Sequence, residues 1–257
     1  MNVLFTLCGR AGSKGVKGKN ARDFLDLPLA WYSLATIALY IKKYAREGDR
    51  FDIVVNTDSE DLMSIVDRAK GIEATKLWRD ASLGGDKVPK VAVILDCLNR
   101  ATERFGCTYN MVVDLDITSP LRSVEDVRNV IERKEYRTDV DVVYTVTHSR
   151  RNPYFNMVKI EDGYFRKALS SHFTTRQEAP VFYDMNASIY AYSVNALQTK
   201  RQDVFFNDHC DAVLMDDTGI LDIDSEEDYN LMQVIAKYLF ESEEKYKAIY
   251  NEILSWK

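Results

Sequence analysis

Several features are scarce in this 257-residue sequence, and each absence narrows the class of protein. No apolar run approaches the ~20 residues that span a bilayer, so we expect no transmembrane segment. The first apolar run ends at Arg10 without a small-residue cleavage site, which predicts no signal peptide and a cytoplasmic protein. The 4 cysteines form no Cys-x-x-Cys pair and the 3 histidines have no metal-ligand spacing, which argues against disulfides and zinc. No cysteine has an evident base nearby in the sequence, so covalent catalysis is not indicated.

An excess of positive charge is also lacking. The net charge is −6 and the pI is about 5.3, so no affinity for nucleic acid or anionic membranes is implied. The hydrophobic content of 46% is enough for one large core. We therefore expect a single domain over residues 1–257, without repeats or linkers.

A basic, glycine-rich loop stands out against this acidic background. Residues 3–8 form an apolar run typical of a buried strand, and residues 9–20 hold four glycines, one arginine and three lysines. Glycine lets the backbone approach a ligand closely, with N–H groups facing an anion, and cations spread along the loop suit a polyphosphate. The loop predicts a triphosphate site after the first strand; the alternative is a flexible basic surface loop.

Two standard phosphate motifs do not match this loop. A P-loop requires four residues between its first glycine and Gly-Lys-Ser/Thr, whereas Gly12 and Gly18 enclose five, and Asn20 replaces the hydroxyl. A dinucleotide fingerprint requires Gly-x-Gly, which is absent from the loop, and this disfavours a dinucleotide oxidoreductase.

Strands and helices alternate along most of the chain, which predicts βαβ units and a parallel sheet. After the first strand we expect further strands at residues 51–56, 111–116, 140–146 and 186–192, and a short strand or extended segment at 219–224. We expect helices at residues 31–41, 60–70 and 88–104, one from Ser123, and one from Ser225 towards Leu254. Residues 150–185 interrupt the pattern with a β-hairpin, which predicts an inserted arm that acts as a substrate lid or a dimer contact.

Carboxylates follow the predicted strands at the edge where the basic loop also lies. In open α/β sheets ligands bind at the carboxyl ends of the strands, which would place Asp116, Asp222 and Asp224 opposite the loop. Asp222 and Asp224 are two residues apart, so on a regular strand they would share one face and one cation. In this arrangement the cations would bind phosphates and the carboxylates opposite them would bind Mg²⁺, which suits phosphoryl or nucleotidyl transfer. The alternative for Asp222 and Asp224 is a solvated acidic turn before a helix.

Several segments together resemble the acylneuraminate (CMP-sialic acid) cytidylyltransferases. Gly9-Arg10-Ala11-Gly12-Ser13-Lys14-Gly15 with Lys19-Asn20 resembles the signature loop of that family. Residues 118–122 (Thr-Ser-Pro-Leu-Arg), Arg176-Gln177 and residues 186–190 (Asn-Ala-Ser-Ile-Tyr) resemble three further family segments. Residues 222–228 resemble its Asp-Ile-Asp-Thr-Glu-Glu-Asp segment, and the matches extend over nearly the whole chain.

This resemblance implies a three-layer α/β/α, Rossmann-like nucleotide-diphospho-sugar transferase fold with a mostly parallel sheet and an inserted β-hairpin dimerisation arm. It implies a homodimer that transfers a nucleoside monophosphate from CTP to the anomeric hydroxyl of a nonulosonic acid, with Mg²⁺ as cofactor. The implied nucleotide-binding residues are Gly9, Arg10, Ala11, Gly12, Ser13, Lys14, Lys19, Asn20, Arg79 and Asp86. The implied sugar-binding residues are Asp116, Thr118, Ser119, Arg176, Gln177 and Asn186. The implied catalytic residues are Arg10, Lys14, Lys19, Asp222 and Asp224; the last two are the expected metal ligands, with Asp116 as a third candidate.

Two departures from the family pattern leave the substrates open. Asp116-Ile117 stands where the family usually has Gln-Pro, which puts a carboxylate in place of a sugar-contacting amide. Residues 86–90 (Asp-Lys-Val-Pro-Lys) replace the small, hydroxyl-rich run often found beside the cytosine. CTP is the default nucleotide, and GTP with a legionaminic-type sugar is the alternative. A non-catalytic nucleotide-sugar binding module is a further alternative, disfavoured because Lys19, Asp222 and Asp224 are all retained.

Overall fold

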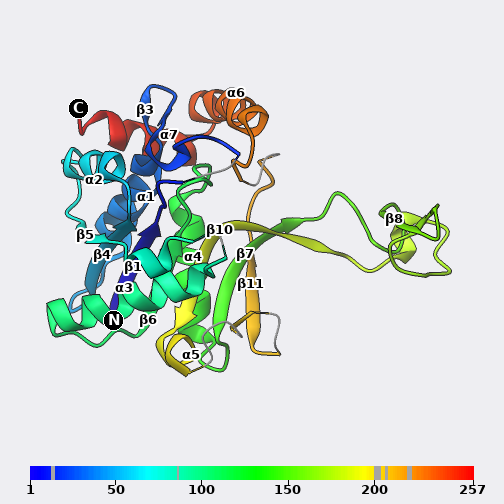
Figure 1. The fold of residues 1–257 in the computed structure, drawn as a ribbon, viewed down its shortest axis with the longest axis horizontal. Helices are drawn as coiled ribbons and strands as arrows, with labels where there is room; N and C mark the ends of the chain where they lie inside the picture. The colour runs from blue at the N-terminus through cyan, green and yellow to red at the C-terminus, as the bar shows by residue number, and fades with distance from the viewer. Residues whose placement is uncertain (13–14, 86, 200–203, 206–207, 219–221) are drawn as a thin grey trace.

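A computed structural model describes residues 1–12, 15–85, 87–199, 204–205, 208–218 and 222–257 of the chain. Within these ranges a seven-stranded sheet runs in the order β11-β7-β10-β6-β1-β4-β5. All neighbouring pairs are parallel except those of β10, which is antiparallel to both β6 and β7. Helices cover both faces of the sheet, and one long arm projects from it (Figure 1). The mostly parallel α/β fold expected from the sequence is confirmed.

The strands of the large sheet are β1 (Asn2–Cys8), β4 (Arg50–Thr57), β5 (Thr75–Trp78), β6 (Met111–Leu115), β7 (Val142–His148), β10 (Tyr183–Ser193) and β11 (Cys210–Leu214). Two small sheets pair β2 (Asp23–Phe24) with β3 (Leu27–Pro28) and β8 (Val158–Glu161) with β9 (Tyr164–Lys167). The α-helices are α1 (Leu29–Tyr44), α2 (Glu60–Asp67), α3 (Lys90–Phe105), α4 (Val124–Tyr136), α5 (Val194–Thr199), α6 (Glu226–Ser242) and α7 (Glu244–Leu254). Short 3-10 helices are η1 (Lys19–Ala21), η2 (Ala81–Leu83) and η3 (Arg176–Glu178).

Alternating side chains of β1 separate the core into two layers. Val3, Phe5 and Leu7 pack with α1, α2, α4, α6 and α7 on one face of the sheet. Leu4 packs with α3 and α5 on the other face. Because successive strand side chains point to opposite faces, one fully apolar strand supplies both layers. On the α3 face the polar Thr6 follows Leu4 and bonds the buried Asp114 of β6, which begins the transition from core to site.

The strand order places a topological switch point between β1 and β6. The chain builds β1, β4 and β5 outward on one side and then returns through α3 to place β6 on the other side of β1. The loops after β1 and β6 therefore diverge at neighbouring carboxyl ends, where ligands of doubly wound sheets bind. These are the basic loop from Gly9 and the segment from Asp116.

The segment between β7 and β10 extends from the large sheet as a long arm (Figure 1). The β8–β9 hairpin lies at its far end, well away from the large sheet (Figure 1). Asp162 and Gly163 form its turn with positive φ values of 54° and 79°. The exposed large apolar side chains in and directly beside the hairpin are Met157, Val158, Ile160, Tyr164, Phe165 and Leu169. The predicted hairpin is confirmed.

Other details differ from the sequence expectations. The helix expected from Ser225 towards Leu254 is two helices, because Glu243 takes an extended conformation (φ −124°, ψ 115°) that ends α6 and starts α7. Asp222–Asp224 belong to no strand, and residues 219–221 of the expected final strand lie outside the described residues. The edge strands β5 and β11 and the six-residue α5 were not predicted. Across the described part of the chain, no helix is long and apolar enough to cross a membrane.

Candidate active site

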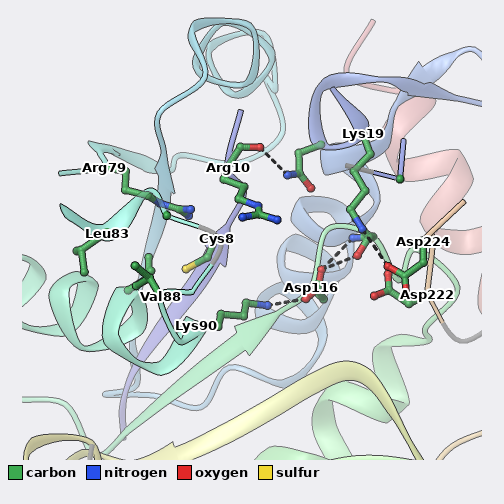
Figure 2. Close-up of a pocket in the computed structure, with 15 residues that line it drawn as sticks. Cys8, Arg10, Lys19, Arg79, Leu83, Val88, Lys90, Asp116, Asp222 and Asp224 are labelled. Atoms are coloured by element: carbon green, nitrogen blue, oxygen red, sulfur yellow. Dashed lines mark hydrogen bonds and ion pairs between the residues drawn. The ribbon is translucent and has the colours of Figure 1, made fainter. Parts of the chain in front are cut away.

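A cavity of about 450 Å³ opens at the switch point, between the basic loop, the start of α3 and the segment before α6 (Figure 2). Four cationic and three anionic side chains line it, together with apolar and glycine positions. Its lining residues are Cys8, Arg10, Gly15, Lys19, Asn20, Arg79, Leu83, Gly85, Val88, Lys90, Val93, Asp116, Thr118, Asp222 and Asp224. The cavity therefore combines the basic loop and the carboxylates that the sequence predicted to meet, although Asp222 and Asp224 do not follow a strand.

The basic loop contacts the acidic segment directly. Lys19 Nζ donates to the carbonyl oxygen of Ile223 at 2.7 Å and lies 3.4 Å from Asp224 Oδ1. A Cβ added at Gly15 would collide with the backbone carbonyl oxygen of Asp224, so only glycine permits this close approach. Asn20 Nδ2 donates to the carbonyl oxygen of Arg10 at 3.0 Å, which ties the two ends of the loop together. Arg10 and Lys19 both point into the cavity (Figure 2).

The remaining loop residues shape the backbone. A Cβ at Gly9 would meet the ends of the Leu62 and Ile117 side chains at under 3.0 Å, so a larger residue there would force these side chains to shift. The N–H of Ala11 donates to Asp58 Oδ1 at 2.7 Å, and that hydrogen bond fixes the start of the turn. Gly12 has open space where its Cβ would be. Ser13 and Lys14, both predicted nucleotide contacts, lie outside the described residues.

Asp222 and Asp224 lie in the same cavity but in different environments. The side chain of Asp224 is 79% exposed, whereas Asp222 is partly buried. Burial raises the pKa of the Asp222 carboxyl above its ordinary value, and the nearby Asp116 carboxylate raises it further, against a hydrogen bond with Thr118. The same-face argument from a regular strand does not apply, because these residues form a loop.

These two carboxylates fit Mg²⁺. A partly buried carboxylate whose ionisation is disfavoured gains when a cation binds, and carboxylate oxygen is the ligand type that Mg²⁺ prefers. Within the described ranges, no group of three or more His, Cys, Asp or Glu side chains is placed to hold a metal ion. Mg²⁺ in phosphate-handling enzymes commonly takes one or two carboxylates plus water and substrate oxygens, so a pair is sufficient.

Lys90 connects the two carboxylates at the end of β6. Its Nζ lies 2.7 Å from Asp114 Oδ2 and 2.6 Å from Asp116 Oδ2. Burial opposes the charge on Lys90, but the two carboxylates outweigh it and raise its pKa well above the ordinary value. Burial likewise opposes the charge on Asp116, yet Lys90 and Thr118 lower its pKa to about 2. Both groups are therefore ionised at neutral pH.

Arg79 closes the opposite end of the cavity, beside Leu83 and Val88 (Figure 2). Its guanidinium is buried, with Nε donating to Asn56 Oδ1 at 2.7 Å and Nη2 donating to the carbonyl oxygen of Asn56 at 3.1 Å. Asn56 is itself held by Asp96, at 3.3 Å from its Nδ2. The wall here is a rigid cation beside apolar side chains, which suits a planar heterocycle. Asp86, predicted nearby, lies outside the described residues.

Several predicted sugar contacts do not line this cavity. Thr118 does, but Ser119 is buried and its carbonyl oxygen accepts a hydrogen bond from Arg122. Asn186 is buried, and its Oδ1 accepts a hydrogen bond from Thr145 Oγ1 at 2.6 Å. Arg176 and Gln177 belong to η3 within the arm, so the cavity of their own chain does not include them.

Sequence reasoning missed Cys8 and Val93 as lining residues. Leu83, Gly85, Val88 and Lys90 fall within residues 79–90, where the family resemblance places the base, but none of the four was singled out. Cys8 had a signal, since it is the last residue of β1. A hydrogen bond with Cys97 and burial raise the pKa of the Cys8 thiol well above its ordinary value, which makes it a poor nucleophile. For Lys90 the available signal was Pro89, a residue typical of helix starts, which places Lys90 at the beginning of α3.

Comparison with known proteins gives consistent similarities. A family model described as cytidylyltransferase matches residues 7–250. The chain is 37% identical over 236 residues to post-translational flagellin modification protein B of Campylobacter coli, covering 91% of this chain and 95% of that protein. It is 36% identical over 234 residues to a CMP-N,N'-diacetyllegionaminic acid synthase of Campylobacter jejuni, and the match covers 91% of this chain and 94% of that protein. The solved structure of a CMP:2-keto-3-deoxy-manno-octonic acid synthetase complexed with CTP shares the fold, with a TM-score of 0.62 and 14% sequence identity. The match covers 94% of this chain and 100% of that one.

Proposed function

This chain belongs to the cytidylyltransferase family, and we propose that it transfers CMP from CTP to the anomeric hydroxyl of a nonulosonic acid, with release of pyrophosphate. The observation that carries the proposal is the contact of Lys19 with Ile223 and Asp224, which joins the basic loop to the acidic segment in one cavity. Nucleotidyl transfer depends mainly on positioning and charge neutralisation, so the raised pKa of Cys8 is no obstacle.

The nucleotide would lie along the cavity between its two cationic ends. Arg10 and Lys19, with Lys14 on the same loop, would bind the triphosphate oxygens. Arg79, Leu83 and Val88 would enclose the base, because they form the other wall. The sequence left CTP and GTP open; a relative named as a CMP-sugar synthase, at 36% identity, favours CTP.

Asp222 and Asp224 would hold Mg²⁺. Bound there, the ion would neutralise phosphate charge and act as a Lewis acid. The chain's own contribution is geometric: Lys19 holds the acidic segment against the basic loop before any ligand arrives.

The acidic sugar would occupy the part of the cavity beside Asp116 and Thr118. Asp116 presents an ionised carboxylate there, and Thr118 donates to it from both its N–H and its hydroxyl. The C. jejuni relative is named for a legionaminic acid, so a legionaminic-type sugar is the first candidate.

The arm would complete this site in a homodimer. Several exposed apolar side chains cluster on the arm, including Ile160, Tyr164 and Phe165. A cluster of this kind, unlike a single exposed apolar residue, is typical of a protein–protein contact. Arg176 and Gln177 would then meet the sugar bound to the partner subunit, since they lie on the arm and do not line the cavity of their own chain.

The test is a panel of CTP, GTP, ATP and UTP crossed with nonulosonic acids, scored by pyrophosphate release with Mg²⁺ and with EDTA. We expect turnover only with CTP, a nonulosonic acid and Mg²⁺ together. Absence of turnover for every pair would refute the proposed activity. Turnover with GTP instead of CTP would refute the nucleotide assignment alone.

The dimer proposal has a separate test. Arg176→Ala should disable the arm and Asp222→Asn the metal site, so each variant alone should be nearly inactive. Subunits of the two variants, unfolded and refolded together, should regain activity if the arm works on the partner's cavity, because some mixed dimers then contain one intact site. If the arm acted on its own chain, mixing would restore nothing.

A further inference from the structure

Asp116 is fixed at every polar atom. Its N–H donates to the carbonyl oxygen of Ser188 at 3.0 Å, and its own carbonyl oxygen accepts a hydrogen bond from Arg122. Carboxylate Oδ1 accepts from the N–H of Thr118 at 3.1 Å and from its hydroxyl at 2.8 Å. Carboxylate Oδ2 accepts from Lys90 at 2.6 Å. A side chain held by partners from several segments of the fold cannot reorient to suit a ligand.

Lys90 is itself held between two carboxylates. It is the first residue of α3, directly after Pro89, and Asp114 fixes its ammonium from below the cavity. Asp114 is fully buried and receives a hydrogen bond from Thr6 at 2.7 Å. Lys90 thus transmits the rigidity of β1 and β6 to Asp116, whose side chain remains 20% exposed towards the cavity.

Both carboxylate oxygens of Asp116 act as acceptors, because the Thr118 N–H and the Lys90 ammonium that bond them can only donate. An ionised carboxylate accepts hydrogen bonds and cannot donate them, whereas an amide at the same position can present either its oxygen or its nitrogen. With Oδ1 saturated by Thr118, Oδ2 keeps acceptor capacity beside its bond to Lys90. A substrate group that faces Oδ2 must therefore be a hydrogen-bond donor.

We propose that Lys90, anchored by Asp114, is a positioning residue that holds Asp116 as a fixed acceptor, and that this acceptor selects nonulosonic acids with a hydrogen-bond donor facing it. The donor is a sugar hydroxyl or an acylamino N–H. The inference rests on the proposed function and adds the residue that governs choice among sugars. A sugar without the donor would leave the Asp116 carboxylate without a hydrogen-bond partner from the substrate. We expect kcat/KM for such a sugar to be roughly ten- to a hundredfold lower.

The test uses the nonulosonic acid that the unmodified enzyme turns over best, together with analogues in which each hydroxyl or acylamino N–H is methylated in turn. We expect the enzyme to reject one analogue by the factor given above. In Lys90→Met and Asp116→Asn that ratio should fall to within a few-fold of unity, with KM for CTP changing much less than KM for the sugar. Lys90→Arg should retain part of the selectivity, because it keeps the cation.

Lys87→Met is the matched control, because Lys87 is an exposed lysine in the same segment and does not line the cavity. It should keep the full ratio. If Lys90→Met fails to fold, Asp114→Asn provides the test. This variant weakens the hold on Lys90 but keeps its ammonium, so the selectivity ratio between the sugar and its methylated analogue should fall part of the way. Turnover with an unchanged ratio in Lys90→Met and Asp114→Asn would overturn this inference alone. Absence of turnover by the unmodified enzyme would overturn the proposed function as well.

Discussion

Arg79 is bound twice by one residue, Asn56, whose side-chain and backbone oxygens accept from Nε and Nη2 at 2.7 and 3.1 Å. Removing the side-chain acceptor in Asn56→Ala leaves a buried guanidinium N–H unpaired and lets Arg79 reorient. We expect KM for CTP to rise roughly tenfold, with a smaller change in KM for the sugar. Steady-state kinetics with each substrate varied in turn would measure both values.

The control for this prediction is Asn129→Ala. Asn129 lies on α4, and its side chain accepts a hydrogen bond from the adjacent Arg128. If both variants raised KM for CTP equally, Asn56 would have no special link to the nucleotide. A fall in kcat alone would likewise contradict a role in binding.

Gly15 and Gly12 allow a sharp test of the contact between the basic loop and the acidic segment. A methyl at Gly15 would collide with the carbonyl oxygen of Asp224, whereas a methyl at Gly12 would enter open space. Gly15→Ala should displace the loop and lower kcat/KM roughly a hundredfold, and Gly12→Ala should cost far less. Equal losses in the two variants would show that loop flexibility matters and that the contact does not.

The ionised carboxylate of Asp222, which is needed to bind Mg²⁺, should lower the free energy of unfolding. Its pKa is raised by burial and by Asp116, so folding disfavours the ionised form. Above the folded-state pKa this penalty is present in full; below the unfolded value, about 3.9, both states are protonated and the penalty disappears. In EDTA, Asp222→Asn should therefore raise the unfolding free energy at pH 7 while abolishing most activity, and the gain should shrink as the pH falls towards about 4.

Asp224→Asn separates the two effects. Because the Asp224 side chain is 79% exposed, its replacement should leave the unfolding free energy nearly unchanged. It should still raise the Mg²⁺ concentration needed for half-maximal activity. A stability gain as large in Asp224→Asn as in Asp222→Asn would contradict the assigned role of burial. Chemical denaturation across pH and Mg²⁺ titration of activity would supply the two measurements.

The sequence was sufficient to predict how the two halves of the cavity meet. Apolar strands followed by polar loops predict a parallel sheet, and the carboxyl ends of such strands share one edge. Arg10, Lys19, Asp116, Asp222 and Asp224 were identified on that basis and from the family resemblance, and all five line the cavity. Their individual binding roles remain predictions.

The sequence was insufficient where tertiary contacts decide the geometry. Lys90 has no local pattern that shows its approach to Asp114, because the pairing depends on how α3 packs against β1. The helix break at Glu243 has neither glycine nor proline to mark it. Asn186 matched a family segment, yet its amide is engaged by Thr145 away from the cavity.

Gly71 faces Trp256, and this contact secures the end of the chain. A Cβ at Gly71 would overlap the indole of Trp256, which packs edge-on against Trp31 with ring centroids 5.8 Å apart. Gly71→Ala should therefore lower the unfolding free energy by about 1–3 kcal/mol, measured by urea denaturation with tryptophan fluorescence. Gly84→Ala is the control, since its added methyl would make only ordinary contacts at 3.5 Å. In a Trp256→Ala background the cost of Gly71→Ala should disappear; if it persisted, the overlap with the indole would not be its cause.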